Sequence, residues 1–396
     1  MKTKPQLVCT ARDGAEVLGY VVIDSTVNGR AVGGLRMLPD IDEAEIRGLA
    51  RAMTLKYGFL GLRHGGAKAG VFGDPDVPIE ERRERLRVFG QAIAPLLRKR
   101  IYVPSTDMGT GSGELREVLI GAGIRSRPGR RGSSTGDYTA LTVLIGVEEA
   151  VRHLGLDLTT CRVVIEGFGK VGSALARLIA DAGAKVVAIS TARGALHSPD
   201  GLNVGRLLDL SQRWGSRVVE HYADAQRITR ESLLELPTDI LCPCARHESI
   251  HEGNAAQIQA RLVVPGANNP ITAGAEQTLF ERGVLCLPDF VTNSGGVLGG
   301  TMEFSGPNNA QVAAFIHRYI GSRVADLLVQ AAEAEVTPRE IAVPLAQSRF
   351  DKMAGAGNDL TTRIFKTCVG LYRRGWVPRA LASAVALAYF RRSLAP

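Results

Sequence analysis

Several kinds of feature are scarce in this chain of 396 residues, and each absence excludes a class of protein. Aromatic residues make up only 5% of the chain, which argues against a surface that stacks sugars or single-stranded nucleic acid. No apolar run reaches the roughly 18 residues that a membrane-spanning helix needs, so we expect no membrane partner. The start, Met1–Pro5, leads into mixed polar sequence rather than a secretory segment, which favours a cytoplasmic protein.

Cysteine is also sparse, and its spacing does not indicate a metal site. Cys242 and Cys244 are separated by one residue, whereas zinc and redox pairs usually have two residues between them. We therefore interpret the cysteines as small core residues of a protein from a reducing compartment, and we expect no metal ligand among them. They are Cys9, Cys161, Cys242, Cys244, Cys286 and Cys368.

The composition that remains is that of a soluble globular α/β protein with more than one domain. Hydrophobic residues make up 45% and charged residues 22%, and the length exceeds that of one ordinary core. The net charge of +8 is spread over sequence that also contains acids, apart from the run Arg125–Arg131. We interpret that run as a linker rather than as a nucleic-acid contact, so small anionic ligands are the expected partners.

The stretch Lys56–Lys68 places two lysines around a glycine-containing segment. Apolar residues before Lys56 recur at helical spacing, so Lys56 is expected in the last turn of an amphipathic helix. Lys68 follows Gly65-Gly66-Ala67, which we interpret as a turn that lets a ligand approach the backbone. A lysine buried there has a pKa lowered toward neutrality, as a general base requires. The alternative for each lysine alone is an exposed, solvated charge.

The segment Cys161–Ala176 contains the second strong pattern. A β-branched run ends at Gly167, further glycines follow at positions 169 and 172, and a helix continues before a new strand at 185–189. This order is typical of the Rossmann dinucleotide-binding unit, in which amides at the start of the helix face a pyrophosphate. The predicted cofactor loop consists of Gly167, Phe168, Gly169, Lys170, Val171 and Gly172.

The acidic residue that usually binds the adenine ribose is missing, because the strand ends in Ser190-Thr191-Ala192-Arg193. Without that carboxylate a 2'-phosphate is not repelled, and Arg193 can pair with it. We therefore predict NAD or NADP as the cofactor, with Thr191 and Arg193 beside it. The alternative is that Arg193 is a solvent-facing loop residue.

Polar loops follow the later strand-like runs at 239–242, 262–264 and 284–287. Asn268 and Asn293 belong to two such loops, which are expected at the carboxyl ends of parallel strands, where these sheets bind ligands. The predicted architecture is α/β, with a substrate domain at 1–130 and a Rossmann domain at 131–305. A helical segment at 306–396 is expected to pack back on the first domain.

Three motifs resemble those of one enzyme family, the amino-acid dehydrogenases that act on glutamate, leucine, phenylalanine or valine. The motifs are Arg51–Lys56, Gly65–Lys68 and Pro104–Thr110, and the likeness extends from about Gly14 to about Gly300. The resemblance implies that Lys56 binds the substrate α-carboxylate and that Lys68 and Asp107 are catalytic. It also implies a nicotinamide contact for Thr139 and a substrate and ribose contact for Asn293. For Asp107 alone the alternative is a turn-stabilising aspartate.

The resemblance also bears on specificity, through the segment Val32–Pro39. Members that act on glutamate have a lysine just before the two glycines, here Gly33 and Gly34, and this chain has Val32 there. An unpaired second carboxylate would be costly to bury beside valine. We therefore expect a hydrophobic amino acid of the leucine, valine or phenylalanine type, as in the leucine and phenylalanine members, with the 2-oxo acid and ammonia as products. A basic residue reaching in from elsewhere would leave glutamate as the alternative substrate.

Three residues depart from the family pattern: His64 before the catalytic glycines, Thr142 in place of glycine, and Lys170 in place of asparagine. His64 either lines the pocket or caps the loop, Thr142 is expected to affect how the domains close, and Lys170 can approach a phosphate. Relatives form oligomers, so a homo-oligomer is expected. The alternative to an enzyme is a non-catalytic dinucleotide-binding protein on the same fold, although intact Lys56, Lys68 and Asp107 argue against it.

Overall fold

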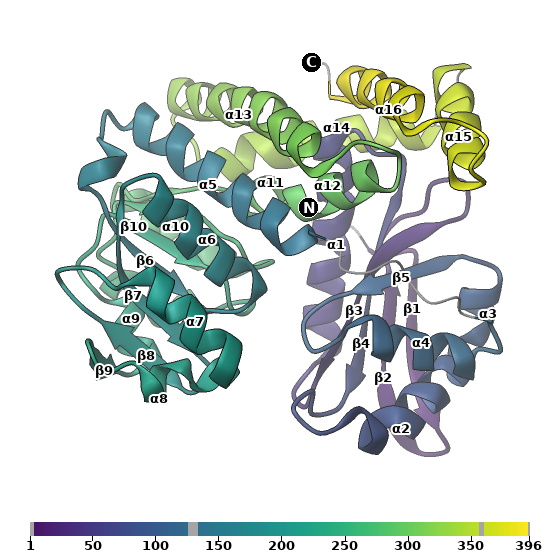
Figure 1. Cartoon of the computed structure of the whole chain (residues 1–396), viewed down its shortest axis with the longest axis horizontal. Coiled ribbons are helices and arrows are strands. Elements are labelled where there is room, and N and C mark those ends of the chain that lie inside the picture. Colours follow the sequence, from purple (N-terminus) through teal and green to yellow (C-terminus); the bar gives the residue numbers. More distant parts are fainter. Residues whose placement is uncertain (1–3, 126–133, 356–359, 395–396) are drawn as a thin grey trace. The chain divides into compact units, whose positions relative to one another are not determined.

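The computed structural model describes residues 4–125, 134–355 and 360–394. The chain divides into two compact units, one made of residues 1–132 and 345–357 and the other of residues 133–344 and 358–396. Each unit contains its own β-sheet (Figure 1). Each also has its own hydrophobic core.

The first unit is built on a five-stranded mixed sheet with the order β1-β2-β4-β3-β5. Strands β3, β4 and β5 run parallel to one another, and β2 is antiparallel to both β1 and β4. The strands are β1 (Leu7–Asp13), β2 (Glu16–Ile23), β3 (Ala31–Leu38), β4 (Gly65–Phe72) and β5 (Tyr102–Thr106). The helices are α1 (Glu43–Leu60), α2 (Ile79–Ala92), α3 (Ala94–Arg98) and α4 (Ser112–Gly121).

The two faces of this sheet are covered by different helices. Ala31, Leu35 and Met37 of β3 face a hydrophobic core formed with helices α2, α3 and α4. Because successive side chains of a strand point to opposite faces, Gly34 and Arg36 lie on the other face. That second face is covered by α1, since a Cβ added to Gly66 or Gly70 of β4 would meet Thr54 or Ile46 of that helix. Polar groups on the second face are therefore enclosed beneath α1.

The glycines before Lys68 do not form the turn expected from the sequence. Gly65 and Gly66 begin the buried strand β4, and α1 continues one turn beyond Lys56 to its cap at Gly61. A Cβ on Gly66 would lie 2.3 Å from the Thr54 backbone nitrogen, so glycine is required for α1 to pack on the strand. The small residues thus permit close helix–strand packing.

The charged stretch from Ile79 to Arg98 does not form one continuous helix. It forms two helices, α2 and α3, separated at Ile93. Pro95 stands in the first turn of α3, where a residue without a backbone N–H is tolerated but cannot continue a preceding helix. The proline therefore explains the break.

The second unit is built on a seven-stranded sheet with the order β12-β11-β10-β6-β7-β8-β9. The central strands are parallel, whereas β8 and β9 add an antiparallel edge. This order confirms the predicted Rossmann-type sheet. The strands are β6 (Arg162–Glu166), β7 (Lys185–Thr191), β8 (Gly194–His197), β9 (Gln226–Ile228), β10 (Ile240–Pro243), β11 (Leu262–Val263) and β12 (Leu285–Cys286).

Helices of the second unit connect these strands and flank the sheet. They are α5 (Thr135–His153), α6 (Lys170–Asp181), α7 (Val204–Trp214), α8 (Val218–His221), α9 (Arg230–Leu234), α10 (Ala273–Glu281), α11 (Asp289–Thr292) and α12 (Gly295–Glu303). The C-terminal helices are α13 (Asn309–Ala334), α14 (Pro338–Gly355), α15 (Leu360–Arg373) and α16 (Arg379–Ser393).

The C-terminal helices return to the first domain only in part. Residues 345–357, which include the second half of α14, group with the first unit, where Arg63 donates a hydrogen bond to the Met353 carbonyl at 3.2 Å. Helix α16 belongs to the second unit and packs on α13, where the rings of Phe315 and Phe390 meet edge to face. The expected return therefore holds for the end of α14, and α15 and α16 stay with the second unit.

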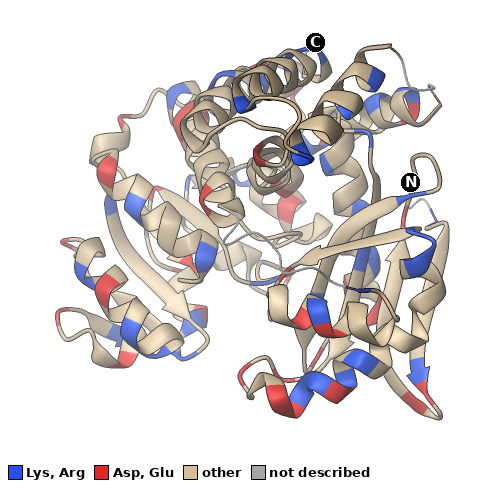
Figure 2. Cartoon of the chain, turned by 45° about the vertical axis from the view of Figure 1, so that its right-hand side comes forward, with Lys and Arg blue, Asp and Glu red and all other residues tan. Residues whose placement is uncertain are grey.

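Charged side chains of both signs are intermixed on each unit. Figure 2 shows Lys and Arg beside Asp and Glu along the same helices, as on α2. Of the basic run that the sequence suggested as a linker, residues 126–131 lie outside the described residues. Over the described part of the chain, no helix is both long and apolar enough to cross a membrane.

Candidate active site

The first unit brings Lys68 and Asp107 into direct contact. Lys68 Nζ lies 2.9 Å from Asp107 Oδ2, and the lysine side chain is 3% exposed whereas that of the aspartate is 17% exposed. Lys68 comes from β4 and Asp107 directly follows β5, with β3 lying between these strands. Gly34 of β3 makes room for the pair, because a Cβ there would lie 2.7 Å from the Asp107 Cβ. The sequence-predicted pair is thus assembled across three strands.

A third charged residue, Arg36, completes this cluster and was missed by sequence reasoning. Its Nε donates to Asp107 Oδ2 at 2.9 Å, and its Nη1 donates to Glu45 of α1. Both Arg36 and Glu45 are buried. The available signal was a charged residue inside the otherwise apolar run Ala31–Leu38, which is unusual for a strand covered on both faces.

Burial and neighbouring charges shift the titration of this cluster. Burial is the largest cause at Lys68 and lowers its pKa; Asp107 opposes the shift and Arg36 adds to it. Burial alone would raise the pKa of Asp107, but the Lys68 ammonium and the Arg36 guanidinium together hold it below its usual range. The carboxylate is therefore ionised, and the lysine loses its proton more readily than a solvated lysine does.

Val32 lies on the same face of β3 as Gly34 and Arg36, by strand alternation. It is half-buried and pairs in register with Gly66 of β4 and Val103 of β5. The residue that the sequence singled out for specificity is thus apolar and has small or apolar neighbours in the sheet.

Helix α1 contributes two further residues to this region. Lys56 is buried, at 4% exposed, and the hydroxyl of the adjacent Tyr57 donates to the Val32 carbonyl at 3.4 Å. His64 packs its ring edge to face against Tyr57, with ring centroids 5.3 Å apart. His64 therefore supports the aromatic ring next to Lys56. Gly33 has a packing function as well, since a Cβ there would lie 1.6 Å from the Ala67 carbonyl oxygen.

In the second unit, the predicted cofactor loop forms a tight turn between β6 and α6. Gly167 has φ +93, in the region that favours glycine, and its N–H donates to Ser190 Oγ at 2.9 Å. A Cβ on Gly172 would lie 1.8 Å from the Gly167 carbonyl oxygen. Gly169 caps the start of α6, and Lys170 is exposed there. The first amides of α6 are therefore presented to an anion, as a pyrophosphate requires.

Glu166, directly before this loop, is a half-buried residue that sequence reasoning did not single out. Burial raises its pKa to about 7, and the opposing effects of the Ser249 hydrogen bond and of Arg230 are smaller. Ser249 Oγ donates to Glu166 Oε2 at 2.8 Å. A group that changes charge near neutral pH thus adjoins the glycine loop.

The end of β7, where an adenine ribose binds in such folds, carries hydroxyl and basic groups. Thr191 Oγ1 donates to the Ser216 carbonyl at 2.7 Å and accepts from the Arg193 N–H at 3.1 Å. Arg217 follows Ser216 and pairs with Glu220 at 2.7 Å. The carboxylate in this region is that of Glu220 on α8, and it is already paired with Arg217.

Asn268 and Asn293 meet beyond the carboxyl ends of β11 and β12. Asn293 Nδ2 donates to the Ala267 carbonyl at 2.8 Å and to Asn268 Oδ1 at 3.0 Å. Asn293 Oδ1 is buried and accepts no hydrogen bond from the described residues. A buried acceptor without a donor fits a ligand that supplies a hydroxyl or an amide, as a nicotinamide riboside does.

Helix α5 packs closely on α12 beside these asparagines. The Gly295 N–H donates to Thr142 Oγ1 at 3.1 Å, so this departure from the family pattern fastens α12 within the second unit. Thr139, one turn earlier, donates to the Thr135 carbonyl at 2.8 Å, and a Cβ on Gly296 would lie 2.5 Å from its hydroxyl oxygen. Thr139 is thus held next to the segment that follows Asn293.

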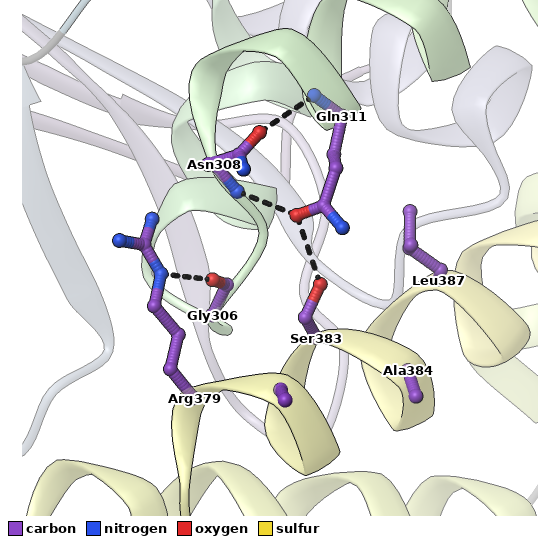
Figure 3. Close-up of a pocket in the computed structure, with 8 residues that line it drawn as sticks. Gly306, Asn308, Gln311, Arg379, Ser383, Ala384 and Leu387 are labelled. Carbon is purple, nitrogen blue, oxygen red and sulfur yellow. Dashed lines mark hydrogen bonds between the residues drawn. The ribbon is translucent and has the colours of Figure 1, made fainter.

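A separate hollow of about 420 Å³ lies in the second unit between the start of α13 and α16 (Figure 3). Arg379 donates to the Gly306 carbonyl at 2.8 Å, and Ser383 donates to Gln311 Oε1 at 3.1 Å. Gln311 and Asn308 also cap the helix reciprocally. The polar groups drawn in Figure 3 thus bond to one another, and none of the sequence-predicted site residues lines this hollow.

Family models match most of the chain. One described as "Glutamate/Leucine/Phenylalanine/Valine dehydrogenase" matches residues 132–354, and one described as "Glu/Leu/Phe/Val dehydrogenase, dimerisation domain" matches residues 6–119. A catabolic NAD-specific glutamate dehydrogenase, RocG, of Bacillus subtilis (strain 168) is 39% identical over 299 residues, which cover 72% of this chain and 70% of the relative. An NAD-specific glutamate dehydrogenase of Staphylococcus aureus (strain COL) is 37% identical, and the match covers 72% of both chains.

Solved structures with the same fold include two dehydrogenases. The hetero-hexameric glutamate dehydrogenase from Thermus thermophilus, in a Leu-bound form, superposes with a TM-score of 0.74 at 26% identity, covering 89% of this chain and 91% of that one. L-tryptophan dehydrogenase from Nostoc punctiforme has a TM-score of 0.60 at 22% identity, covering 88% of this chain and 96% of that one. The second similarity is one of fold alone.

Proposed function

Because the chain belongs to the Glutamate/Leucine/Phenylalanine/Valine dehydrogenase family, we propose that it oxidatively and reversibly deaminates a hydrophobic L-amino acid. The products are the 2-oxo acid and ammonia, and the electron acceptor is NAD or NADP. The observation that carries the choice of substrate is Val32, an apolar side chain on the face of β3 that also bears Gly34 and Arg36. The enzyme class follows from family membership, whereas substrate, cofactor preference and residue roles are our proposal.

Each polar residue of the first unit has a defined task in this reaction. Lys56 binds the α-carboxylate and so fixes the substrate Cα. A bound nicotinamide dinucleotide supplies the acceptor for the hydride that leaves Cα. Lys68 removes a proton from the water that adds to the resulting iminium, which its lowered pKa supports. Asp107 carries protons to and from the substrate nitrogen, and its negative charge offsets the positive charge there.

Specificity follows from the charges available to a substrate side chain. Arg36, a cation on the same face as Val32, is already bonded to Asp107 and Glu45. With Arg36 engaged, a second substrate carboxylate beside Val32 would need another cation, and burying it without one would cost several kcal/mol. An aliphatic or aromatic side chain loses no such interaction and gains from leaving water.

Glutamate is the second candidate substrate, because the relatives with 36–39% identity are glutamate dehydrogenases. Glutamate requires a cation in the pocket for its side-chain carboxylate, whereas a hydrophobic amino acid does not. A direct comparison of substrates separates them.

The cofactor site in the second unit fits a dinucleotide of either kind. The glycine loop and the start of α6 suit a pyrophosphate, and the buried Asn293 oxygen suits a donor on the ribose or the nicotinamide. Arg193 at the end of β7 can pair with a 2'-phosphate, whereas the relatives from Bacillus subtilis and Staphylococcus aureus are NAD-specific by name. We therefore propose that both NAD and NADP bind.

The chain is further proposed to act as a homo-oligomer. The model that matches residues 6–119 is described as a dimerisation domain, and the Thermus thermophilus structure is described as hetero-hexameric. Light scattering on the purified chain measures the mass of the assembly directly, and a monomeric mass would contradict this proposal.

Turnover of five amino acids tests the proposed reaction. The formation of reduced nicotinamide is followed by absorbance at alkaline pH with leucine, valine, phenylalanine, tryptophan or glutamate, each with NAD and with NADP. We expect turnover with an apolar substrate. Turnover with glutamate alone would contradict the argument from Val32, and no turnover with any pair would favour a non-catalytic dinucleotide-binding protein.

A further inference from the structure

The two charge-assisted bonds to the Asp107 carboxylate end on the same oxygen. Lys68 Nζ and Arg36 Nε each lie 2.9 Å from Oδ2. The Asp107 side chain remains 17% exposed, and neither of these two bonds uses Oδ1. The carboxylate is thus held by two cations through one of its two oxygens.

We propose that Arg36, held in turn by Glu45, is a positioning residue that keeps Asp107 oriented toward the substrate throughout the reaction. This inference depends on the proposed catalytic role of Asp107. Nothing in the family resemblance assigns a task to Arg36 or Glu45. Arg36 acts through Asp107 and has no assigned contact with the substrate.

The reason that Lys68 cannot hold Asp107 alone is its own function. A general base must lose its proton, and a neutral lysine is a weak partner for a carboxylate. The Arg36 guanidinium stays charged at every working pH and donates from a planar fork with fixed geometry. Asp107 therefore keeps one constant partner while the charge of the other changes during turnover.

Glu45 makes it possible to bury this arginine. A guanidinium removed from water without counterions is strongly disfavoured, and Glu45 supplies a second counterion, which contacts Nη1 whereas Asp107 contacts Nε. Glu45 lies in the first turn of α1, where its N–H donates to the Asp42 side chain at 2.7 Å. The capped start of α1 thus fixes Glu45, Glu45 fixes Arg36, and Arg36 fixes Asp107.

The same network links Asp107 to the helix of the substrate-binding lysine. Glu45 and Lys56 both belong to α1, and both are buried. A shift of α1 would therefore move the partner of Arg36 as well as Lys56. The chain of contacts runs from Glu45 of α1 through Arg36 of β3 and Asp107, directly after β5, to Lys68 of β4.

The experiment measures kcat and KM across pH, together with Tm, for Arg36→Gln, Arg36→Lys and Glu45→Gln. With the best substrate, we expect Arg36→Gln to lower kcat about 10- to 100-fold, because the carboxylate is misplaced, with a smaller change in KM. Loss of the cation beside Lys68 also raises the pKa of that lysine, so the rising limb of the pH profile moves to higher pH. Arg36→Lys keeps the positive charge. We therefore expect its rising limb to lie at the wild-type pH, with a kcat between those of the wild type and Arg36→Gln.

Arg87→Gln is the matched control, because it breaks an ion pair with Glu117 between α2 and α4, away from the cluster. It is expected to lower Tm without moving the pH profile. If Arg36→Lys and Glu45→Gln fold but keep the wild-type kcat and pH profile, the positioning role is wrong, whatever the fate of Arg36→Gln. A fall in Tm alone would likewise overturn it.

Asp107→Asn separates this inference from the proposed function. If Asp107→Asn retains full turnover, the catalytic role of Asp107 fails, and the inference about Arg36 fails with it. If Asp107→Asn is inactive while the Arg36 variants behave as wild type, only the positioning role is overturned.

Discussion

A Cβ atom on Gly34 would lie 2.7 Å from the Cβ of Asp107, so the position of the carboxylate depends on the absence of a side chain at residue 34. The same added atom would lie 3.3 Å from Lys68 Nζ. Glycine at this point of β3 is therefore a condition for the contact between Lys68 and Asp107. The glycine pair of the sequence motif thus has a steric explanation that does not depend on the family resemblance.

Gly34→Ala is expected to lower kcat about 100-fold, because a displacement of about 1 Å at a reacting group has effects of that size. Gly113→Ala is the matched control, since a Cβ there meets nothing within 4 Å. Steady-state kinetics and Tm of both variants check the prediction. Wild-type kcat in Gly34→Ala would show that Asp107 tolerates the displacement.

Lys68→Ala is expected to reduce turnover by about 100- to 10,000-fold, the usual contribution of a general base. Dinucleotide affinity is expected to change little, because Lys68 belongs to the first unit and the glycine loop to the second. Kinetics and titration of intrinsic fluorescence with NAD measure the two effects. Lys99→Ala, at an exposed position, is the control, and unchanged turnover in Lys68→Ala would remove this residue from the mechanism.

Val32→Lys is expected to shift the ratio of kcat/KM between glutamate and leucine toward glutamate. An ion pair worth about 1.4 kcal/mol corresponds to a tenfold shift. Val32→Leu keeps the position apolar and is expected to leave glutamate disfavoured. An unchanged ratio in Val32→Lys would mean that residue 32 does not face the substrate side chain.

Glu166 is expected to make stability depend on pH. Its folded pKa is about 7, above the ordinary value of 4.5, so the unfolded chain loses its proton first as pH rises. The free energy of unfolding contributed by this group is therefore present below about pH 4.5 and falls as pH rises toward about 7. We expect Glu166→Gln to have a higher Tm than the wild type at pH 8, with a smaller difference near pH 5.

Glu235→Gln, at an exposed position, controls for the loss of one negative charge. A difference in Tm between Glu166→Gln and the wild type that stays constant from pH 5 to pH 8 would show that Glu166 does not titrate in this range. Circular dichroism at several pH values is sufficient for this measurement.

The sequence by itself determined the family, the fold class and the nucleotide-binding unit. The family prediction from motifs at Lys56, Lys68 and Asp107 is confirmed by the matching models. The strand, glycines and helix around Gly167–Gly172 were predictable because their conformations depend on residues close together in the chain. The positive φ of Gly167 is one such local feature, because glycine adopts this conformation more easily than other residues do.

The tertiary structure decided which charges meet and which glycines pack. Gly65 and Gly66 suggested a turn, but burial under α1 makes them a strand, because a distant helix rather than the local sequence selects the conformation. Arg36 and Glu45 are near in sequence, but their contact depends on how α1 folds back over β3, and Asp107 joins them from the position directly after β5. Long-range pairing of this kind leaves no periodic signal in one sequence, because it depends on strand order and on helix placement.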